Sequence, residues 1–163
     1  MHLVGDKSEF AIEYALTGAC PPPYGYLRLW VAGLPLGDLT EAMHLYHGLS
    51  TLKKCTQRNL ETDRMMCNSA SGLPDPESAL RDSYLSLGEA HDYYELAIYT
   101  ITSEQRLRFY WREFKRRDSP TDSVNPLHQK DVSWNTFDQI VLSVTGAIEA
   151  RILEESGMSF SFD

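Results

Sequence analysis

Few residues in this 163-residue chain have the types and spacing that metal chemistry requires. His44 and His47 lie three positions apart, a spacing that brings two side chains together on a helix and could hold a metal ion. Neither a His-Glu-x-x-His motif nor a third ligand at a useful spacing accompanies them. We therefore interpret them as a histidine pair on a helix surface, and we expect no metal site and no other cofactor.

Signatures of covalent catalysis and of nucleotide binding are also absent from the sequence. Nucleophilic catalysis needs an activated serine or cysteine beside a base, but there is no Gly-x-Ser-x-Gly elbow and no hydrolase motif around Cys20, Cys55 or Cys67. Walker and Gly-x-Gly-x-x-Gly loops are missing. We expect a protein that is not an enzyme, although a small enzyme without a recognisable motif stays open as an alternative.

The most basic segment, residues 106–117, interleaves arginines and lysines with aromatic side chains. Nucleic-acid-binding strands use this combination, but so does a hairpin strand with an aromatic core face and a basic solvent face. The whole chain has a net charge of −8, so its field outside this segment repels phosphate backbones. We favour the hairpin and expect no nucleic-acid partner. A contact with an acidic patch on a protein partner is the other open interpretation.

The elements that position these residues can be predicted from periodicity. Apolar residues alternate with polar ones in the segments that we expect to form strands, and they recur every three or four residues in those that we expect to form helices. The expected strands are 9–16, 24–32 and 34–36, which form a meander, and 94–102 with 106–114, which form a hairpin. The expected helices are about 40–54, 76–87 and 133–155, whereas 55–75 and 115–131 are expected to be mainly loops.

Signals at the ends of these segments refine the helix predictions. Thr40 is a plausible N-cap for the first helix, and Ser133 and Gly157 suit the start and end of the last one. Trp30 suits a core position. Because strands and helices do not strictly alternate, the sequence predicts one α+β domain over residues 1–163, with an antiparallel sheet of about five strands and about three helices.

The expected compartment follows from what the sequence lacks. No stretch approaches the ~20 apolar residues of a membrane helix, and the first residues carry no secretory signal. Three cysteines at irregular spacings fit reduced thiols better than a disulfide framework. We expect a cytoplasmic protein with no membrane partner, and the sequence leaves its oligomeric state open.

Two motifs near the start of the chain resemble a known family. Residues 5–13 read Gly-Asp-Lys-Ser-Glu-Phe-Ala-Ile-Glu, and residues 30–38 read Trp-Val-Ala-Gly-Leu-Pro-Leu-Gly-Asp. They resemble the Gly-Asp-x-Ser-x-Phe-Ala-Ile-Glu and Trp-x-x-Gly-x-x-x-Gly-Asp stretches of the type-42 immunity proteins of bacterial polymorphic-toxin and contact-dependent growth inhibition systems. The resemblance implies a cytosolic antitoxin that binds and blocks the toxic domain of a cognate effector. It brings no catalytic residues.

The negative charge of the chain suggests how such an inhibitor would recognise its toxin. Many toxins of these systems are basic nucleases, and opposite fields speed association. We therefore expect outward-facing carboxylates to contact the toxin. The candidates are Glu9, Glu13, Asp38, Glu41, Glu89, Asp92 and Glu95. A protein-binding adaptor or structural subunit with no toxin-related role is the alternative function.

Overall fold

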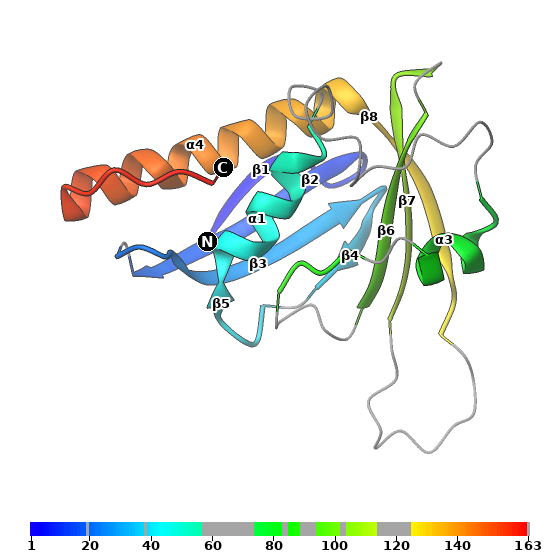
Figure 1. Ribbon diagram of the computed structural model, residues 1–163, viewed down its shortest axis with the longest axis horizontal. Helices are drawn as coiled ribbons and strands as arrows, with labels where there is room; N and C mark the ends of the chain where they lie inside the picture. The colour runs from blue at the N-terminus through cyan, green and yellow to red at the C-terminus, as the bar shows by residue number, and fades with distance from the viewer. Residues whose placement is uncertain are drawn as a thin grey trace.

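Two antiparallel sheets and three helices make up the part of the chain that the computed structural model describes (Figure 1). The described residues are 1–18, 20–37, 39–56, 74–82, 85–88, 94–101, 104–113 and 125–162. The α+β class, with a five-stranded sheet among its elements, is confirmed. The predicted meander and the predicted hairpin lie in separate sheets.

The first sheet contains the meander. Its strands are β1 (His2–Asp6), β2 (Phe10–Gly18), β3 (Tyr24–Val31), β4 (Leu34–Leu36) and β5 (Met43–His44). They run in the order β1-β2-β3-β4, and β5 pairs with the start of β3. The alternation of apolar and polar residues in the sequence gives this sheet one buried face and one polar face. Ile12 lies opposite Leu29 on the buried face, and Glu13 lies opposite Arg28 on the other.

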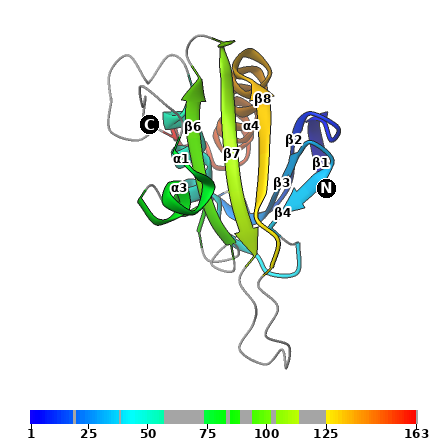
Figure 2. The ribbon, with the colours of Figure 1, turned by 90° about the vertical axis from the view of Figure 1, so that its right-hand side faces the viewer.

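The second sheet contains the hairpin and one further strand. Its strands are β6 (Tyr94–Ile101), β7 (Arg106–Glu113) and β8 (His128–Ser133), in that order. Leu107, Phe109 and Trp111 of β7 are buried against the core, as their alternation with the arginines predicts. Figure 2 looks onto this sheet and shows α3 (Pro76–Asp82) lying against its outer face.

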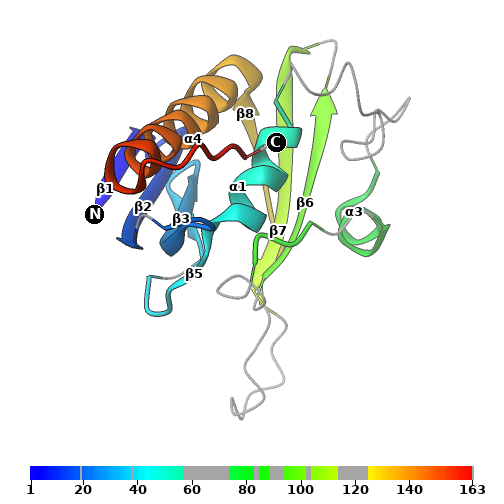
Figure 3. The ribbon, with the colours of Figure 1, turned by 60° about the vertical axis from the view of Figure 1, so that its left-hand side comes forward.

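The other two helices, α1 (Leu45–Lys54) and α4 (Trp134–Ser156), lie on the same side of the first sheet (Figure 3). The ends of α4 are those predicted: the Ser133 side chain accepts a hydrogen bond from the Thr136 amide, and Gly157 ends the helix with a φ of 68°. An aromatic cluster joins this helix to both sheets, since the Phe10 ring lies 5.1 Å from that of Phe137 and 5.8 Å from that of Phe109.

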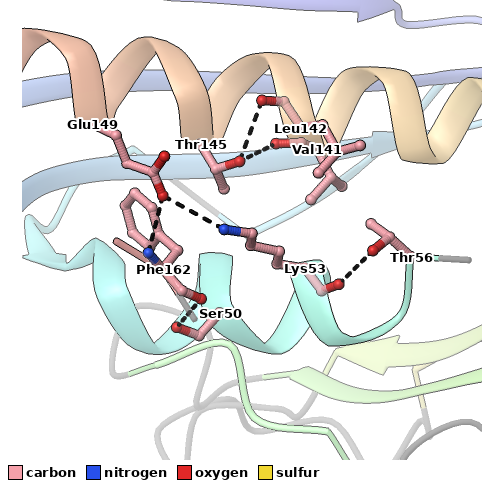
Figure 4. A network of polar contacts seen from close by, with 8 residues as sticks. All are labelled: Ser50, Lys53, Thr56, Val141, Leu142, Thr145, Glu149 and Phe162. Atoms are coloured by element: carbon pink, nitrogen blue, oxygen red, sulfur yellow. Dashed lines mark hydrogen bonds and ion pairs between the residues drawn. The ribbon is translucent and has the colours of Figure 1, made fainter. Parts of the chain in front are cut away.

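A network of polar contacts fastens the C-terminal segment between α1 and α4 (Figure 4). Glu149 of α4 pairs with Lys53 of α1 at 3.5 Å and accepts a hydrogen bond from the Phe162 amide at 3.0 Å. The Ser50 hydroxyl donates to the Phe162 carbonyl at 3.2 Å. Phe162 is only 1% exposed, so this end of the chain completes the core instead of trailing from it.

Three strands were not predicted, because their sequences lack an apolar alternation. Four of the five residues of β1 are exposed, and β8 has a single fully buried residue, Val132. The prediction that residues 115–131 are loop is therefore wrong from His128 onward. β5 is only two residues long and exists because Met43 pairs with Gly25 of β3, a distant contact that no local pattern reveals.

Two helix boundaries also differ from the prediction. The first helix starts at Leu45, with His44 and not Thr40 as its N-cap, because the pairing of β5 with β3 holds the preceding residues extended. The Leu45 amide donates to the Pro23 carbonyl at 2.9 Å. The second helix ends at Asp82, and Leu85 instead donates its amide to Leu96 of β6 at 2.7 Å. Most of the predicted 55–75 loop lies outside the described residues.

Candidate functional site

The seven acidic candidates do not form one cluster in the described part of the chain. Asp38, Glu89 and Asp92 lie outside the described residues. Glu9 and Glu41 are exposed and make no ion pair with any residue that the structure describes. Glu9 lies near the last residue of β3, since the Ala32 amide donates to its carbonyl. Glu41 precedes Ala42, whose carbonyl accepts a hydrogen bond from the hydroxyl of Tyr24, the first residue of β3. The two glutamates therefore adjoin opposite ends of β3, which is about 20 Å long.

The other two candidates, Glu13 and Glu95, are engaged in ion pairs within the chain. The Glu13 carboxylate accepts a hydrogen bond from the Trp30 indole at 3.0 Å, and Lys7 and Arg28 each approach it to 3.7 Å. The Glu95 carboxylate accepts two hydrogen bonds from Arg112, at 2.9 and 2.6 Å. Within the chain, Glu13 and Glu95 therefore neutralise neighbouring cationic side chains.

The pairing of Glu13 identifies a second candidate surface, on the outer side of the first sheet. We call it the Trp30 face, and it consists of Lys7, Glu13, Tyr26, Arg28 and Trp30. In both views α1 and α4 lie on the opposite side of this sheet, and no described helix covers the Trp30 face (Figures 1 and 3). Tyr26 and Trp30 are half-buried, so part of each ring is open to a partner.

Several contacts hold the Trp30 indole in place. Besides its hydrogen bond to Glu13, the ring has the Lys7 ammonium 4.0 Å from its centroid and the Arg28 guanidinium at 5.7 Å. The buried Nε atom of Arg28 has no hydrogen-bond partner among the residues that the structure describes. Trp, Tyr and Arg are the residues that dominate binding energy at protein interfaces, and a ring that is already fixed loses little entropy on binding.

The interpretation of Trp30 as a core residue is wrong. Its ring lies on the outer face with Tyr26 and Arg28, opposite the buried Leu27, Leu29 and Val31. In the sequence of this strand, Trp30 is in phase with Tyr26 and Arg28 and out of phase with the apolar residues. An aromatic residue in phase with the solvent face was therefore the signal that could have found this surface.

Two arginines on the outer face of the second sheet form ion pairs within the chain. Arg108 binds both carboxylate oxygens of Asp131, at 2.6 and 2.7 Å, and these hydrogen bonds hold the pKa of Asp131 below its usual value. Arg112 contacts Glu77 of α3 at 3.0 Å as well as Glu95. The aromatic core face predicted for this strand is confirmed, and residues 114–117 lie outside the described part of the chain.

The groups considered for chemistry are dispersed in the structure. His44 is the N-cap of α1 and packs edge-on against Tyr24, whereas His47 lies in the exposed first turn of the helix. Among the described residues, no three His, Cys, Asp or Glu side chains gather in a way that could hold a metal ion. No helix in the described ranges is long and apolar enough to cross a membrane.

Comparison with known families places the chain in one of them. The family model of Immunity protein 42 matches residues 1–146, which include both sheets and more than half of α4. The chain belongs to the Immunity protein 42 family. Membership supports an immunity role, in which the protein binds a cognate toxin, and it extends the resemblance seen in residues 5–38 to most of the chain. Neither the curated proteins nor the solved structures include a match to this immunity protein.

Proposed function

We propose that this immunity protein neutralises the toxic C-terminal domain of a cognate effector, a basic nuclease, by binding it one-to-one over its active site. The observation that carries the proposal is the family match over residues 1–146. The inhibitor would act in the cytoplasm of cells that carry a polymorphic-toxin or contact-dependent growth inhibition system. No catalytic step is required, because a covered active site is excluded from its substrate.

The charge of the chain supports a basic target. With a net charge of −8, the protein attracts a cationic domain over the ~8 Å range of electrostatic interaction at physiological salt. Such steering raises association rates by about 10- to 1000-fold, which matters for an antitoxin that must reach its target before the target reaches nucleic acid.

Among the candidate carboxylates, Glu9 and Glu41 are the best first tests of this electrostatic proposal. They are exposed and carry no ion pair in the described part of the chain, so reversing their charge leaves the fold intact. Glu13 and Glu95 are poorer tests, because each neutralises an arginine and its replacement would also disturb the sheet. The Trp30 face supplies the aromatic and guanidinium groups that provide binding energy at a protein interface.

Co-expression with the protein encoded immediately upstream tests the proposal. We expect the immunity protein to restore growth of cells that produce this toxin and to co-purify with a catalytically inactive version of it. If growth is not restored and no complex forms, the proposed function is wrong.

A further inference from the structure

A cavity of about 260 Å³ lies where the edge of the first sheet meets one end of the second. Leu34 and Pro35 of β4 form one wall, and the buried Trp111 of β7 with His128 of β8 forms another. The Trp111 and His128 rings are stacked, with centroids 5.0 Å apart. The cavity exists because β4 is only three residues long and the first sheet ends there, while the inner face of β7 continues past Trp111.

The remaining wall carries one carboxylate. Tyr94 and Glu113 face each other across β6 and β7, one position beyond the last fully buried pair of that face. Asn125 donates its side-chain amide to the Glu113 carbonyl at 2.8 Å and so holds the chain entering β8 against this end of β7. Glu113 itself is exposed, and its carboxylate forms no ion pair within the described ranges.

The size and lining of the cavity restrict what can enter it. Ligand sites for small molecules usually measure about 300–1000 Å³, so this cavity suits a single side chain better than a substrate. An anion would be repelled by Glu113. A purely apolar side chain would strip water from this carboxylate without replacing the lost hydrogen bonds, which is unfavourable. A cationic side chain can make cation–π contacts with the aromatic walls and a charge-assisted hydrogen bond with the carboxylate.

We propose that the cavity receives a lysine or arginine side chain of the bound toxin. Its aliphatic part would lie against Leu34, Pro35 and Trp111, and its charged end would meet Glu113. This inference rests on the proposed function and adds a specific anchor to it. Pro35 also lies opposite Trp30 across β3 and β4, so the cavity and the Trp30 face adjoin at the same sheet edge. A buried anchor beside aromatic contacts is the usual arrangement of an interface hot spot.

Glu113→Gln tests the anchor, and Glu104→Gln is its matched control. Both residues are exposed glutamates: Glu113 is the last residue of β7, and Glu104 lies two residues before β7 begins. Each variant therefore removes one negative charge with little change of shape. Binding to the purified, inactive toxin domain would be followed by surface plasmon resonance, with thermal melting to confirm that both variants are folded. We expect Glu113→Gln to raise the dissociation rate about 10- to 100-fold and Glu104→Gln to change it less than about twofold.

The outcomes separate the anchor from the proposed function. Alanine substitution of each lysine and arginine on the toxin surface should reveal one position whose loss has no further effect in the Glu113→Gln background. If wild type binds tightly but the two glutamine variants dissociate at the same rate, the anchor is wrong and the proposed function stands. If wild type does not bind the toxin, the proposed function fails and the anchor fails with it.

Discussion

The glycine in the middle of α1 provides a test in which two physical effects oppose each other. Gly48 is an unfavourable residue for a helix interior, so helix propensity alone predicts that Gly48→Ala stabilises the protein by about 1 kcal/mol. The structure predicts the opposite sign. A methyl group at this position would lie 2.5 Å from the Leu87 carbonyl oxygen and 3.2 Å from the side chain of Leu27.

The steric effect should win, because the obstacle is backbone rather than the end of a flexible side chain. Leu87 is only 2% exposed and Leu27 is fully buried, so neither can move without disturbing the core. Overpacking of this kind costs about 1–3 kcal/mol. After subtracting the gain in propensity, we expect Gly48→Ala to lower the free energy of unfolding by up to about 2 kcal/mol.

Gly146 provides the matched control for this prediction. It lies in the interior of α4, is exposed, and has nothing within 4 Å of an added methyl group. Gly146→Ala should therefore raise the free energy of unfolding by about 0.5–1 kcal/mol. Urea unfolding followed by circular dichroism measures both variants. If Gly48→Ala were as stable as Gly146→Ala, the close approach of residues 85–88 to α1 would be refuted.

Three further predictions address the core, an ion pair and the Trp30 face. Phe137→Ala should lower the free energy of unfolding by about 3–5 kcal/mol. Leu142→Ala, on the exposed side of the same helix, should change it by less than about 0.5 kcal/mol. Equal losses of free energy in urea unfolding of the two variants would contradict the assigned core. Asp131→Asn should cost about 1–2 kcal/mol at neutral pH. Because Arg108 lowers the pKa of Asp131 in the folded state, this stabilisation exists above pH ~4 and is lost as the pH falls through the lowered value, so the two proteins should converge in acid unfolding curves. Trp30→Ala should weaken toxin binding by at least about 30-fold by calorimetry while remaining folded, and an unchanged affinity would exclude the Trp30 face from the interface.

Local sequence patterns predict the strands and helices that have one buried face and one exposed face. β2 and β3 have one buried face and one polar face, so period-two alternation reveals them, and α4 combines an apolar stripe with a serine N-cap and a glycine end. β1, β5 and β8 lie at the edges of their sheets and bury little. They form because a neighbouring strand is available to pair with them. A local sequence pattern carries no information about that neighbour.

The candidate site was harder to predict than the fold, since it depends on which strands become neighbours. Glu13 looks like a free surface carboxylate in the sequence, but the register of β2 and β3 places it beside Arg28 and the Trp30 indole. Glu95 is paired with Arg112 for the same reason. The cavity beside Glu113 joins β4 to β6 and β7, which are far apart in the chain, and no spacing in the sequence brings them together.

We propose that the protein inhibits its toxin by binding over the toxin's active site. Titration of the purified, active toxin with the immunity protein, with cleavage of nucleic acid as the readout, tests this most directly. We expect the activity to fall linearly and to be abolished at one molar equivalent, where size-exclusion chromatography with light scattering should find a one-to-one complex. Full activity in the presence of excess immunity protein, or inhibition without a stable complex, would contradict it.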